Sequence, residues 1–492
     1  MTRHRVMRYD RGVKRRLVPA DRLPPLSESF VDGDVSWWYR ATGGVPVPRP
    51  SLDGDRTADV AIVGGGLTGL WTAYYLRRAR PDLAVVVVEK EFAGFGASGR
   101  NGGWLTAEVP GQLGRFAETH GVAGAAAMQR AMTDAVDEVI AVAAEEGIEA
   151  DIRKDGVLHV ATNAAQLARM RCENEELLRY GLGPGDLVEM GATELAERVR
   201  VAGALGATWS PHCARVQPAR LTRGVAAAAE RHGAVIVEGT TVERIEPGVV
   251  HTDRGTVRAP VVVRALEGFT ADLPGRRRDW LPMSSSMIVT APLPEAAWDE
   301  IGWRGAELLG DGAHGFAYAQ RTEDGRIALG GRAVPYRFGS RHDRRGETLG
   351  RTVDQLRAML ARLFPAASAA PVEHAWAGVL GVPRDWCATV GLDRETGLGW
   401  AGGYVGHGLT STNLAGRTLT DLVLGHDTDL TALPWVGRRV RRWEPEPARW
   451  IAVRGLYRAY GAADAREDAR SDPAGTGRTS RIARVADRVT GR

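Results

Sequence analysis

The clearest pattern of hydrophobic and polar positions is the stretch Val60–Glu89, which reads VAIVGGGLTGLWTAYYLRRARPDLAVVVVE. Its first four residues, Val60–Val63, are all apolar, as in a buried strand, and a glycine-rich turn follows them. Apolar residues then recur at helical spacing to about Arg80, with Ala73 and Leu76 on the face expected to meet a sheet. A second apolar run completes the stretch. The pattern predicts a strand, a helix and a second strand that form one βαβ-type unit.

Further along the chain, helical and strand patterns alternate before a block that is mainly β. We expect helices at about 111–148, 164–181, 219–233, 346–363, 411–425 and 446–467. We expect strands at 156–162, a strand pair at 234–246, and a hairpin with a buried strand at 249–265. The block from 284 to 405 is mainly β and includes a hairpin with Glu323-Asp324-Gly325 at its turn. The polar, arginine-rich tail beyond 468 is expected to be partly disordered.

Composition places the chain among ordinary globular proteins. It has 492 residues, of which 44% are hydrophobic and 25% charged, so it is long enough for two domains or one large composite. The formal net charge is only +4, and the only lysines are Lys14, Lys90 and Lys154. We find neither zinc-finger spacing nor interleaved aromatic and basic residues, so we expect no nucleic-acid partner.

Cysteine usage and hydropathy indicate the cellular compartment of the protein. The three cysteines, Cys172, Cys213 and Cys387, lie far apart in sequence, which favours a reducing cytoplasm and argues against a disulfide scaffold or a cysteine-rich metal site. The basic N-terminus is not followed by an apolar segment, so no secretory signal is predicted. The uncharged stretch Val60–Leu76 is short for a membrane span and contains four glycines. We read it as strand plus buried helix, and expect a cytoplasmic protein without a membrane span or a metal.

The turn after the first strand contains a dinucleotide fingerprint. Gly64, Gly66 and Gly69 give the spacing G-x-G-x-x-G, and Glu89 follows 20 residues after the last glycine, at the end of the second strand. The first glycine permits a tight turn, the second a close approach to a pyrophosphate, and the third close packing of helix on strand. The helix N-terminus offers N–H groups to phosphates, and the glutamate accepts hydrogen bonds from ribose hydroxyls. The cofactor-binding candidates here are Gly64, Gly66, Leu67, Thr68, Gly69, Glu89 and Lys90. The alternative is a βα turn without a ligand.

A second glycine-rich segment, GFGASGRNGG at 94–103, follows this unit. By itself it is either a flexible linker or a loop that lies against a ligand. Together with the fingerprint it resembles the D-amino acid oxidase superfamily of FAD enzymes, and within it the group of gamma-glutamylputrescine oxidoreductases. In that family the loop runs beside the flavin. The resemblance therefore implies that Ser98, Arg100, Asn101 and Gly102 contact FAD.

Two later segments agree with the resemblance. AGGYVGHGLTSTNLAG (401–416) resembles the family's C-terminal flavin motif, in which a glycine turn opens a helix. The resemblance implies that the following residues contact the flavin: Gly406, His407, Gly408, Leu409 and Thr410. Val242 is at the position where the family's backbone contacts adenine. Ala265-Leu266-Glu267-Gly268 stands where the family closes its FAD domain with a small-residue turn, and Leu266 departs from that pattern.

The expected fold is an α/β (α+β composite) of a Rossmann-like FAD/NAD(P)-binding domain with an antiparallel-sheet substrate domain, as in the family's glutathione-reductase-type FAD fold. The expected divisions are an N-terminal arm (1–57), three parts of the FAD-binding domain (58–110, 206–280 and 386–430), a helical substrate-domain segment (111–205), a substrate-binding antiparallel sheet (281–385), and a C-terminal helix with a basic tail (431–492).

The resemblance implies oxidation of a C–H bond beside an amine nitrogen. A hydride passes to flavin N5, and O2 is the expected acceptor, giving hydrogen peroxide. The small-molecule substrate is an amine or an amino-acid-like compound. No acid–base triad is required, and none is evident in the sequence. Some relatives bind FAD covalently, but segment 94–103 contains neither Cys nor His, and Gly378 falls near the linking cysteine of sarcosine oxidases. We expect non-covalent FAD and take Cys387 as a buried apolar residue.

The sequence offers fewer candidate catalytic residues than cofactor-binding ones. Relatives that oxidise amino acids use an arginine to bind the substrate carboxylate, and Leu380 stands at that position here. This favours an amine or polyamine-like substrate, or a carboxylate bound by another arginine such as Arg332. His407 is a candidate for the positive charge that helps O2 accept an electron, and Tyr318 for a residue of the substrate pocket. For His407 the alternative is a histidine that only caps the helix. Further pocket candidates are Tyr404, Trp376 and His314, although aromatic residues in a sheet more often belong to the core.

Three alternatives remain at this point. A flavin dehydrogenase would pass electrons to a quinone or a protein. A flavin monooxygenase would need NAD(P)H, although the sequence has no second complete fingerprint. A third possibility is a protein that binds FAD without catalysis.

Overall fold

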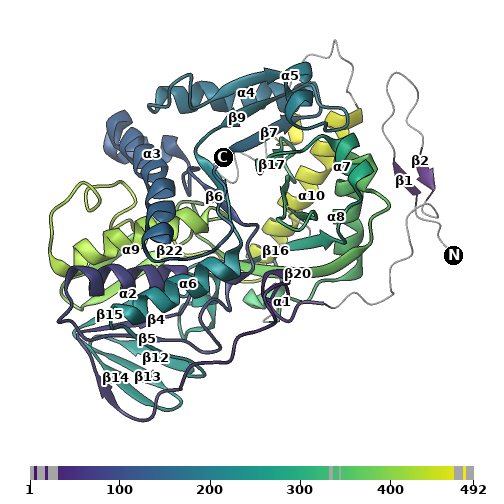
Figure 1. The fold of residues 1–492 in the computed structure, drawn as a ribbon. Helices are drawn as coiled ribbons and strands as arrows, with labels where there is room; N and C mark the ends of the chain where they lie inside the picture. Colours follow the sequence, from purple (N-terminus) through teal and green to yellow (C-terminus); the bar gives the residue numbers. More distant parts are fainter. Residues whose placement is uncertain are drawn as a thin grey trace.

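The computed structural model describes residues 32–331, 336–342, 345–469 and 480–483, together with the short paired strands β1 (Arg5–Met7) and β2 (Leu17–Pro19). Arg332 and most of the tail beyond 469 lie outside these ranges. Two large sheets dominate the architecture, each with its own helices, and Figure 1 shows them side by side.

The first sheet has six strands in the order β11-β5-β4-β15-β22-β21. Its strands are β4 (Val60–Val63), β5 (Val85–Val88), β11 (Val235–Val237), β15 (Val261–Arg264), β21 (Thr389–Asp393) and β22 (Leu398–Gly402). All neighbours are parallel except β21 and β22. The predicted βαβ unit is thus confirmed, and the sheet draws its strands from three separate stretches of the chain.

Both faces of this sheet are covered. Helices α2 (Leu67–Ala79), α6 (Pro218–Arg231) and α9 (Gly408–Leu424) pack on one face, with α3 (Leu113–Glu145) against them. A four-stranded sheet of β3 (Arg56–Thr57), β12 (Val242–Glu246), β13 (Val249–Thr252) and β14 (Gly255–Arg258) covers the other face. Figure 1 shows α2 and α6 above β4 and β5, and β12–β14 below them. Along β4, Val60 and Ile62 belong to the core between the six-stranded sheet and the helices. Ala61 and Val63 belong to the core between the six-stranded and four-stranded sheets. Burial on both faces explains the uninterrupted apolar run.

The second sheet has eight strands in the order β20-β16-β19-β18-β17-β7-β9-β8. Its strands are β7 (Val157–Ala161), β8 (Val188–Gly191), β9 (Gly206–Ser210), β16 (Leu281–Thr290), β17 (Leu308–Asp311), β18 (Ala317–Arg321), β19 (Ile327–Gly331) and β20 (Val372–Val382). All neighbours pair antiparallel except β17 and β7, which run parallel. Strand β9 begins the stretch 206–280, which is expected from the sequence to belong to the FAD-binding domain. The structure instead pairs β9 with β7 and β8 of this second sheet.

One face of the eight-stranded sheet packs on α5 (Ala192–Arg198), α7 (Glu295–Ile301) and α8 (Gly350–Leu363). Leu158 and Val160 of β7 belong to that core. Because side chains alternate along a strand, His159 between them faces the opposite side, toward the other sheet. Helix α4 (Ala164–Arg179) follows β7 along the chain.

The remaining elements connect these parts. They are α1 (Trp37–Arg40), β6 (Trp104–Thr106), β10 (Cys213–Arg215), α10 (Ala448–Ala469), and the 3₁₀ turns η2 (Ala97–Gly99), η3 (Glu267–Asp272), η4 (Phe338–Ser340) and η5 (Pro365–Ala367). Aromatic residues attach the described part of the N-terminal arm: Trp38 and Tyr39 are buried, and Trp38 donates a hydrogen bond to the carbonyl of Asn101 at 2.8 Å. The hairpin expected around Glu323–Gly325 is confirmed as β18–β19. Among the described residues, no helix is both long enough and apolar enough to cross a membrane.

Candidate active site

The glycine turn between β4 and α2 requires glycine for steric reasons. Gly64 has φ +112°, and a Cβ there would lie 2.6 Å from the carbonyl oxygen of Ala265. A Cβ at Gly69 would lie 2.1 Å from the carbonyl oxygen of Gly64 and 3.0 Å from a methyl group of Ile62. The third glycine therefore allows α2 to pack directly on β4, as the fingerprint predicts.

The N-terminus of α2 exposes backbone donors beside a carboxylate. Glu89 accepts hydrogen bonds from the backbone N–H of Gly65 at 2.7 Å and of Glu91 at 3.0 Å. Burial raises the pKa of Glu89 to about 7. Within the described chain, the backbone N–H groups of Gly66 and Thr68 have no protein acceptor. Free N–H groups at a helix N-terminus form an anion-binding site, with the carboxylate placed beside it.

The segment 94–103 is an ordered loop that packs on this turn, so the linker interpretation is wrong. Gly94 donates a backbone hydrogen bond to Gly65 at 2.9 Å, and the hydroxyl of Ser98 accepts one from Leu67 at 2.8 Å. The side chain of Asn101 fixes the loop internally, because it donates to the carbonyl of Ser98 and accepts from the N–H of Gly103, both at 2.8 Å.

Arg100 stabilises the same loop from its buried side. Its guanidinium donates to the carbonyl oxygens of Phe95 at 2.7 Å and Ala377 at 3.3 Å, and lies over the Phe95 ring. These contacts attach the loop to strand β20. A direct contact of this guanidinium with a cofactor stays a prediction.

The C-terminal glycine motif forms a second helix N-terminus. Helix α9 begins at Gly408, and the side chain of His407 makes no capping hydrogen bond. In the part of the chain that the structure describes, no protein group accepts from the backbone N–H of Gly408, Leu409 or Thr410. The buried hydroxyl of Thr410 also has no hydrogen-bond partner among these residues. This terminus therefore presents unpaired donors, as the first one does.

Glu267 holds the loop that leads into α9. Its carboxylate accepts backbone hydrogen bonds from Gly403 at 2.9 Å and Tyr404 at 3.0 Å, and a third from Gly381 of β20. Burial raises its pKa to about 7, and its backbone is left-handed, with φ +47°. The hydroxyl of Tyr404 in turn lies 3.0 Å from that of Thr68 on α2. These contacts bring the two helix N-termini together. Glu267 is not among the site residues predicted from the sequence.

One cavity of about 1420 Å³ connects both helix N-termini with the eight-stranded sheet. Ligand pockets for small molecules usually measure about 300–1,000 Å³, so this cavity has room for a dinucleotide and a substrate. All predicted cofactor-binding residues line it except Gly69 and Thr410, which lie behind its wall. The cavity thus brings together Val242 of β12, Lys90 and the three glycine-rich segments 64–69, 94–103 and 401–416.

At the far end of the cavity lie the residues expected for substrate. Tyr318 and Leu380 both line the cavity, and the hydroxyl of Tyr318 lies 2.9 Å from that of Ser285. Trp376 does not line it: the ring is fully buried and donates to the carbonyl of Arg100 at 2.8 Å. Tyr404 lines the cavity, although most of its ring is buried and its hydroxyl lies against Thr68 of α2. Arg332 lies outside the described residues.

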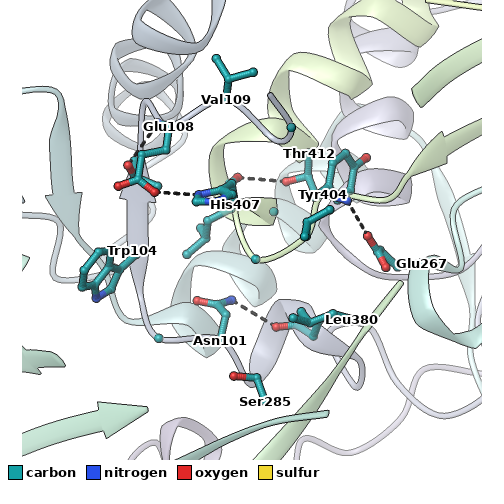
Figure 2. A pocket seen from close by; sticks show the side chains of 18 of the residues that line it. Asn101, Trp104, Glu108, Val109, Glu267, Ser285, Leu380, Tyr404, His407 and Thr412 are labelled. Carbon is teal, nitrogen blue, oxygen red and sulfur yellow. Dashed lines mark hydrogen bonds and ion pairs between the residues drawn. The ribbon is translucent and has the colours of Figure 1, made fainter. Parts of the chain in front are cut away.

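A cluster of three ionisable side chains lines the cavity, and only His407 among them is predicted from the sequence. Glu108, two residues after β6, lies 2.9 Å from Nε2 of His159 and 2.9 Å from Nδ1 of His407. Figure 2 shows Glu108 and His407 pointing toward each other, with Leu380 and Ser285 on another part of the wall. His159 offered one signal in the sequence, a polar residue between two core residues of a strand. Glu108 offered none.

Comparison with known proteins identifies the family of the chain. Residues 59–422 match the family model described as "FAD dependent oxidoreductase" (DAO). The chain belongs to the FAD-dependent oxidoreductase (DAO) family. It is 29% identical to gamma-glutamylputrescine oxidoreductase of Escherichia coli (strain K12), over 80% of this chain and 89% of that protein. It is 30% identical to the probable oxidoreductase OrdL of Rhizobium meliloti (strain 1021), over 80% of this chain and 90% of that protein.

Solved structures give the same fold. The glycine oxidase of Geobacillus kaustophilus superposes with a TM-score of 0.64 at 23% identity, covering 78% of this chain and 99% of that one. The predicted fold class, an FAD-binding α/β unit with a substrate sheet, is confirmed by this DAO-family fold.

The residues of the cavity fit the FAD of this family. The unpaired N–H groups at the start of α2 match a pyrophosphate, and Glu89 matches the ribose hydroxyls. The unpaired N–H groups of Gly408 and Leu409 at the start of α9 would face the flavin end. FAD is thus the cofactor of the chain, and the predicted assignment is confirmed at the level of the family.

A further cluster at the cavity rim is structural. Ligand-type atoms of His314, Asp464 and Glu467 lie within 4.8 Å of one another. Asp464 already accepts from the backbone N–H groups of His314 at 2.8 Å and Gly315 at 2.9 Å, and Glu467 pairs with Arg169 at 2.8 Å. These contacts attach α10 to the substrate end of the cavity. His314 lines the cavity beside this attachment.

Proposed function

We propose that this enzyme oxidises the CH–NH bond of an amine or amino-acid-derived substrate. The observation that supports the proposal is the single cavity, which runs from the FAD end to a pocket between the eight-stranded sheet and the loop that precedes α9. FAD, when bound, supplies the hydride acceptor. The chain's own residues orient the substrate and limit its contact with water.

Relatives support the choice of an amine. Their names include a gamma-glutamylputrescine oxidoreductase and glycine oxidases, all of which act on nitrogen compounds. Leu380 stands on β20 where amino-acid oxidases of the family have an arginine, and it lines the cavity. An apolar side chain there does not compensate the charge of a carboxylate. We therefore favour an amine or polyamine-like substrate over a simple α-amino acid, unless Arg332 binds a carboxylate.

We further propose that O2 reoxidises the flavin and that FAD is bound without a covalent link. The ordered loop 94–103 contains neither Cys nor His. His407, at the N-cap of α9, and Tyr318 are the candidate catalytic residues of the pocket. The three unpaired cysteines agree with a reducing cytoplasm, where we place the reaction.

An anaerobic amine panel tests the proposal. The purified, FAD-loaded protein is mixed with putrescine, γ-glutamylputrescine, N-methylglycine and glycine, and the loss of flavin absorbance is followed. We expect rapid bleaching by at least one amine and recovery of the colour, with peroxide, when air is admitted. Bleaching without peroxide would replace the oxidase with a dehydrogenase. A flavin that NADPH bleaches and no amine reduces would contradict the proposal.

A further inference from the structure

Three ionisable groups from three separate elements meet in the cavity wall. Glu108 comes from the loop after β6, His159 from β7 of the substrate sheet, and His407 from the N-cap of α9. The carboxylate oxygens of Glu108 divide between them, Oε1 to Nε2 of His159 and Oε2 to Nδ1 of His407. The side chains keep 30–39% of their surface accessible, and all three line the cavity, so they are within reach of a substrate.

The protonation of this cluster follows from its hydrogen bonds. Burial alone raises the pKa of Glu108, but the hydrogen bonds from the two histidines outweigh it and hold the pKa well below its usual range. An ionised carboxylate only accepts hydrogen bonds. Both ring nitrogens that face Glu108 must therefore carry a hydrogen. For His407 this means Nδ1–H.

One carboxylate balances one positive charge. Burial lowers the pKa of His159, but the hydrogen bond and charge of Glu108 outweigh it, so the pKa lies above its usual value. Glu108 thus favours the charged form of the His159 ring. Because Nδ1 of His407 donates to Glu108 at 2.9 Å, Nε2 is the nitrogen that carries the lone pair in a neutral His407 ring. No group in the described part of the chain pairs with this Nε2.

Three other ionisable side chains lie near the cluster, on α4 and β10. Glu173 of α4 interacts with His159 and Glu108, and burial raises its pKa. Arg169, also on α4, partly offsets the charge of Glu173 and is paired with Glu467. Burial raises the pKa of the Cys213 thiol on β10 to about 12, so the thiol is neutral.

We propose that Glu108 is a positioning residue that holds His407 in the tautomer whose Nε2 accepts the proton of the incoming ammonium group. This inference rests on the proposed amine substrate. An alkylammonium group has a pKa near 10, so it enters the cavity charged, and only the neutral amine can lose a hydride. In the step, one N–H bond of the ammonium breaks and the Nε2–H bond of His407 forms. The cluster gains one positive charge, which Glu108 stabilises, and the proton later passes to water.

The kinetic test compares Glu108→Gln with Glu146→Gln. Glu146 also accepts from a histidine, His232, at 2.8 Å, but it does not line the cavity, so it is a matched control. Anaerobic flavin reduction is measured across pH with the fastest amine of the panel. We expect Glu108→Gln to slow reduction at neutral pH about 100-fold. The loss should shrink as the pH rises and disappear near the pKa of the amine, about 10, because the substrate then arrives already neutral.

A second test needs neither substrate nor turnover. The protein is labelled with ¹⁵N-histidine, and the His407 signals are assigned with His407→Asn. We expect a protonated Nδ1 and an unprotonated Nε2 for His407 near neutral pH, and a protonated ring for His159. Glu108→Gln should lower the pKa of His159 and abolish the single tautomer of His407, whereas Glu146→Gln should change neither.

The outcomes separate the inference from the function on which it rests. A protonated Nε2 on His407 in the unmodified protein would overturn the inference. So would a Glu108→Gln variant that reduces its flavin at the normal rate and is slow only with O2, because the cluster would then serve reoxidation. If no amine reduces the flavin of any variant, the proposed function fails, and the NMR result still decides the protonation of the cluster.

Discussion

The two ends of the cavity are constructed differently. At the FAD end, the groups that face a ligand are mainly backbone N–H groups of Gly66, Thr68 and the first turn of α9, supported by Glu89 and Ser98. At the substrate end they are side chains, Glu108, His159 and His407, from distant segments. In the proposed arrangement, the cofactor is bound mainly through main-chain geometry, whereas the proton chemistry depends on three side chains that packing brings together.

The largest effect is expected where backbone geometry is most constrained. Gly69→Ala places a Cβ 2.1 Å from the carbonyl oxygen of Gly64. We expect a loss of about 3 kcal/mol in the free energy of unfolding, because neither helix nor strand can move aside without strain, and loss of FAD binding. Denaturant unfolding and FAD titration measure both.

Gly461→Ala in α10 is the matched control, since a Cβ there meets no atom within 4 Å. It should raise the free energy of unfolding by about 0.5–1 kcal/mol and leave FAD affinity unchanged. Normal FAD binding by Gly69→Ala would show that FAD binding does not depend on the main-chain geometry of this turn.

Glu89→Gln tests the one charged side chain among those FAD-end groups. We expect FAD affinity to fall about 10–100-fold, since hydrogen bonds to a charged acceptor are worth about 1.5–3 kcal/mol. Burial raises the pKa of Glu89 to about 7 in the FAD-free protein, so the ionised acceptor is populated only above that pH. FAD affinity should therefore rise with pH through about 7 in the unmodified protein and not in Glu89→Gln. Asp82→Asn, at an exposed carboxylate paired with Arg80, is the control.

Ser98→Ala removes the acceptor for the backbone N–H of Leu67. This contact resembles a helix N-cap, so the free energy of unfolding should fall by about 1 kcal/mol. FAD affinity should fall less than for Glu89→Gln. A larger loss of affinity than at Glu89 would mean that the serine contacts the cofactor directly.

The smallest effect concerns stability at the substrate end. The pKa of Glu108 is lowered by folding, so its contribution is present above about pH 4.3 and is lost as the pH falls through the folded value. The pKa of His159 is raised by folding, so its contribution is present below about pH 6.5 and is lost as the pH rises through the folded value. Glu108→Gln should therefore lower the free energy of unfolding most between about pH 4.3 and 6.5, by about 1 kcal/mol, since both side chains remain partly accessible. A loss independent of pH would mean that the pair is not ionic.

The FAD end could be predicted from the sequence because its chemistry is local. The spacing of Gly64, Gly66 and Gly69 and the run up to Glu89 define one βαβ unit, whatever the rest of the chain does. The loop 94–103 packs on that same unit, so its place beside the glycine turn also followed from adjacent residues. Even here Arg100, expected beside the flavin, directs its guanidinium to the carbonyls of Phe95 and Ala377.

The substrate end could not be predicted in the same way. Glu108 meets His159 and His407 only because the two large sheets face each other across the cavity, and no spacing in the sequence encodes that arrangement. For this reason no acid–base triad is evident in the sequence. Glu267 is a similar case, since its carboxylate accepts from Gly381 of β20 and from Gly403, the residue after β22. The parallel pairing of β7 with β17 also departs from the expected antiparallel sheet, because strands from distant segments join there.

One paired measurement tests the central claim that the two ends have separate tasks. FAD affinity and the rate of anaerobic flavin reduction at saturating FAD are measured for Glu89→Gln and Glu108→Gln beside the unmodified protein. We predict that Glu89→Gln weakens FAD binding and leaves the reduction rate unchanged, whereas Glu108→Gln binds FAD normally and is slow to reduce it near neutral pH. Loss of both properties in both variants, or the reverse assignment, would contradict the account.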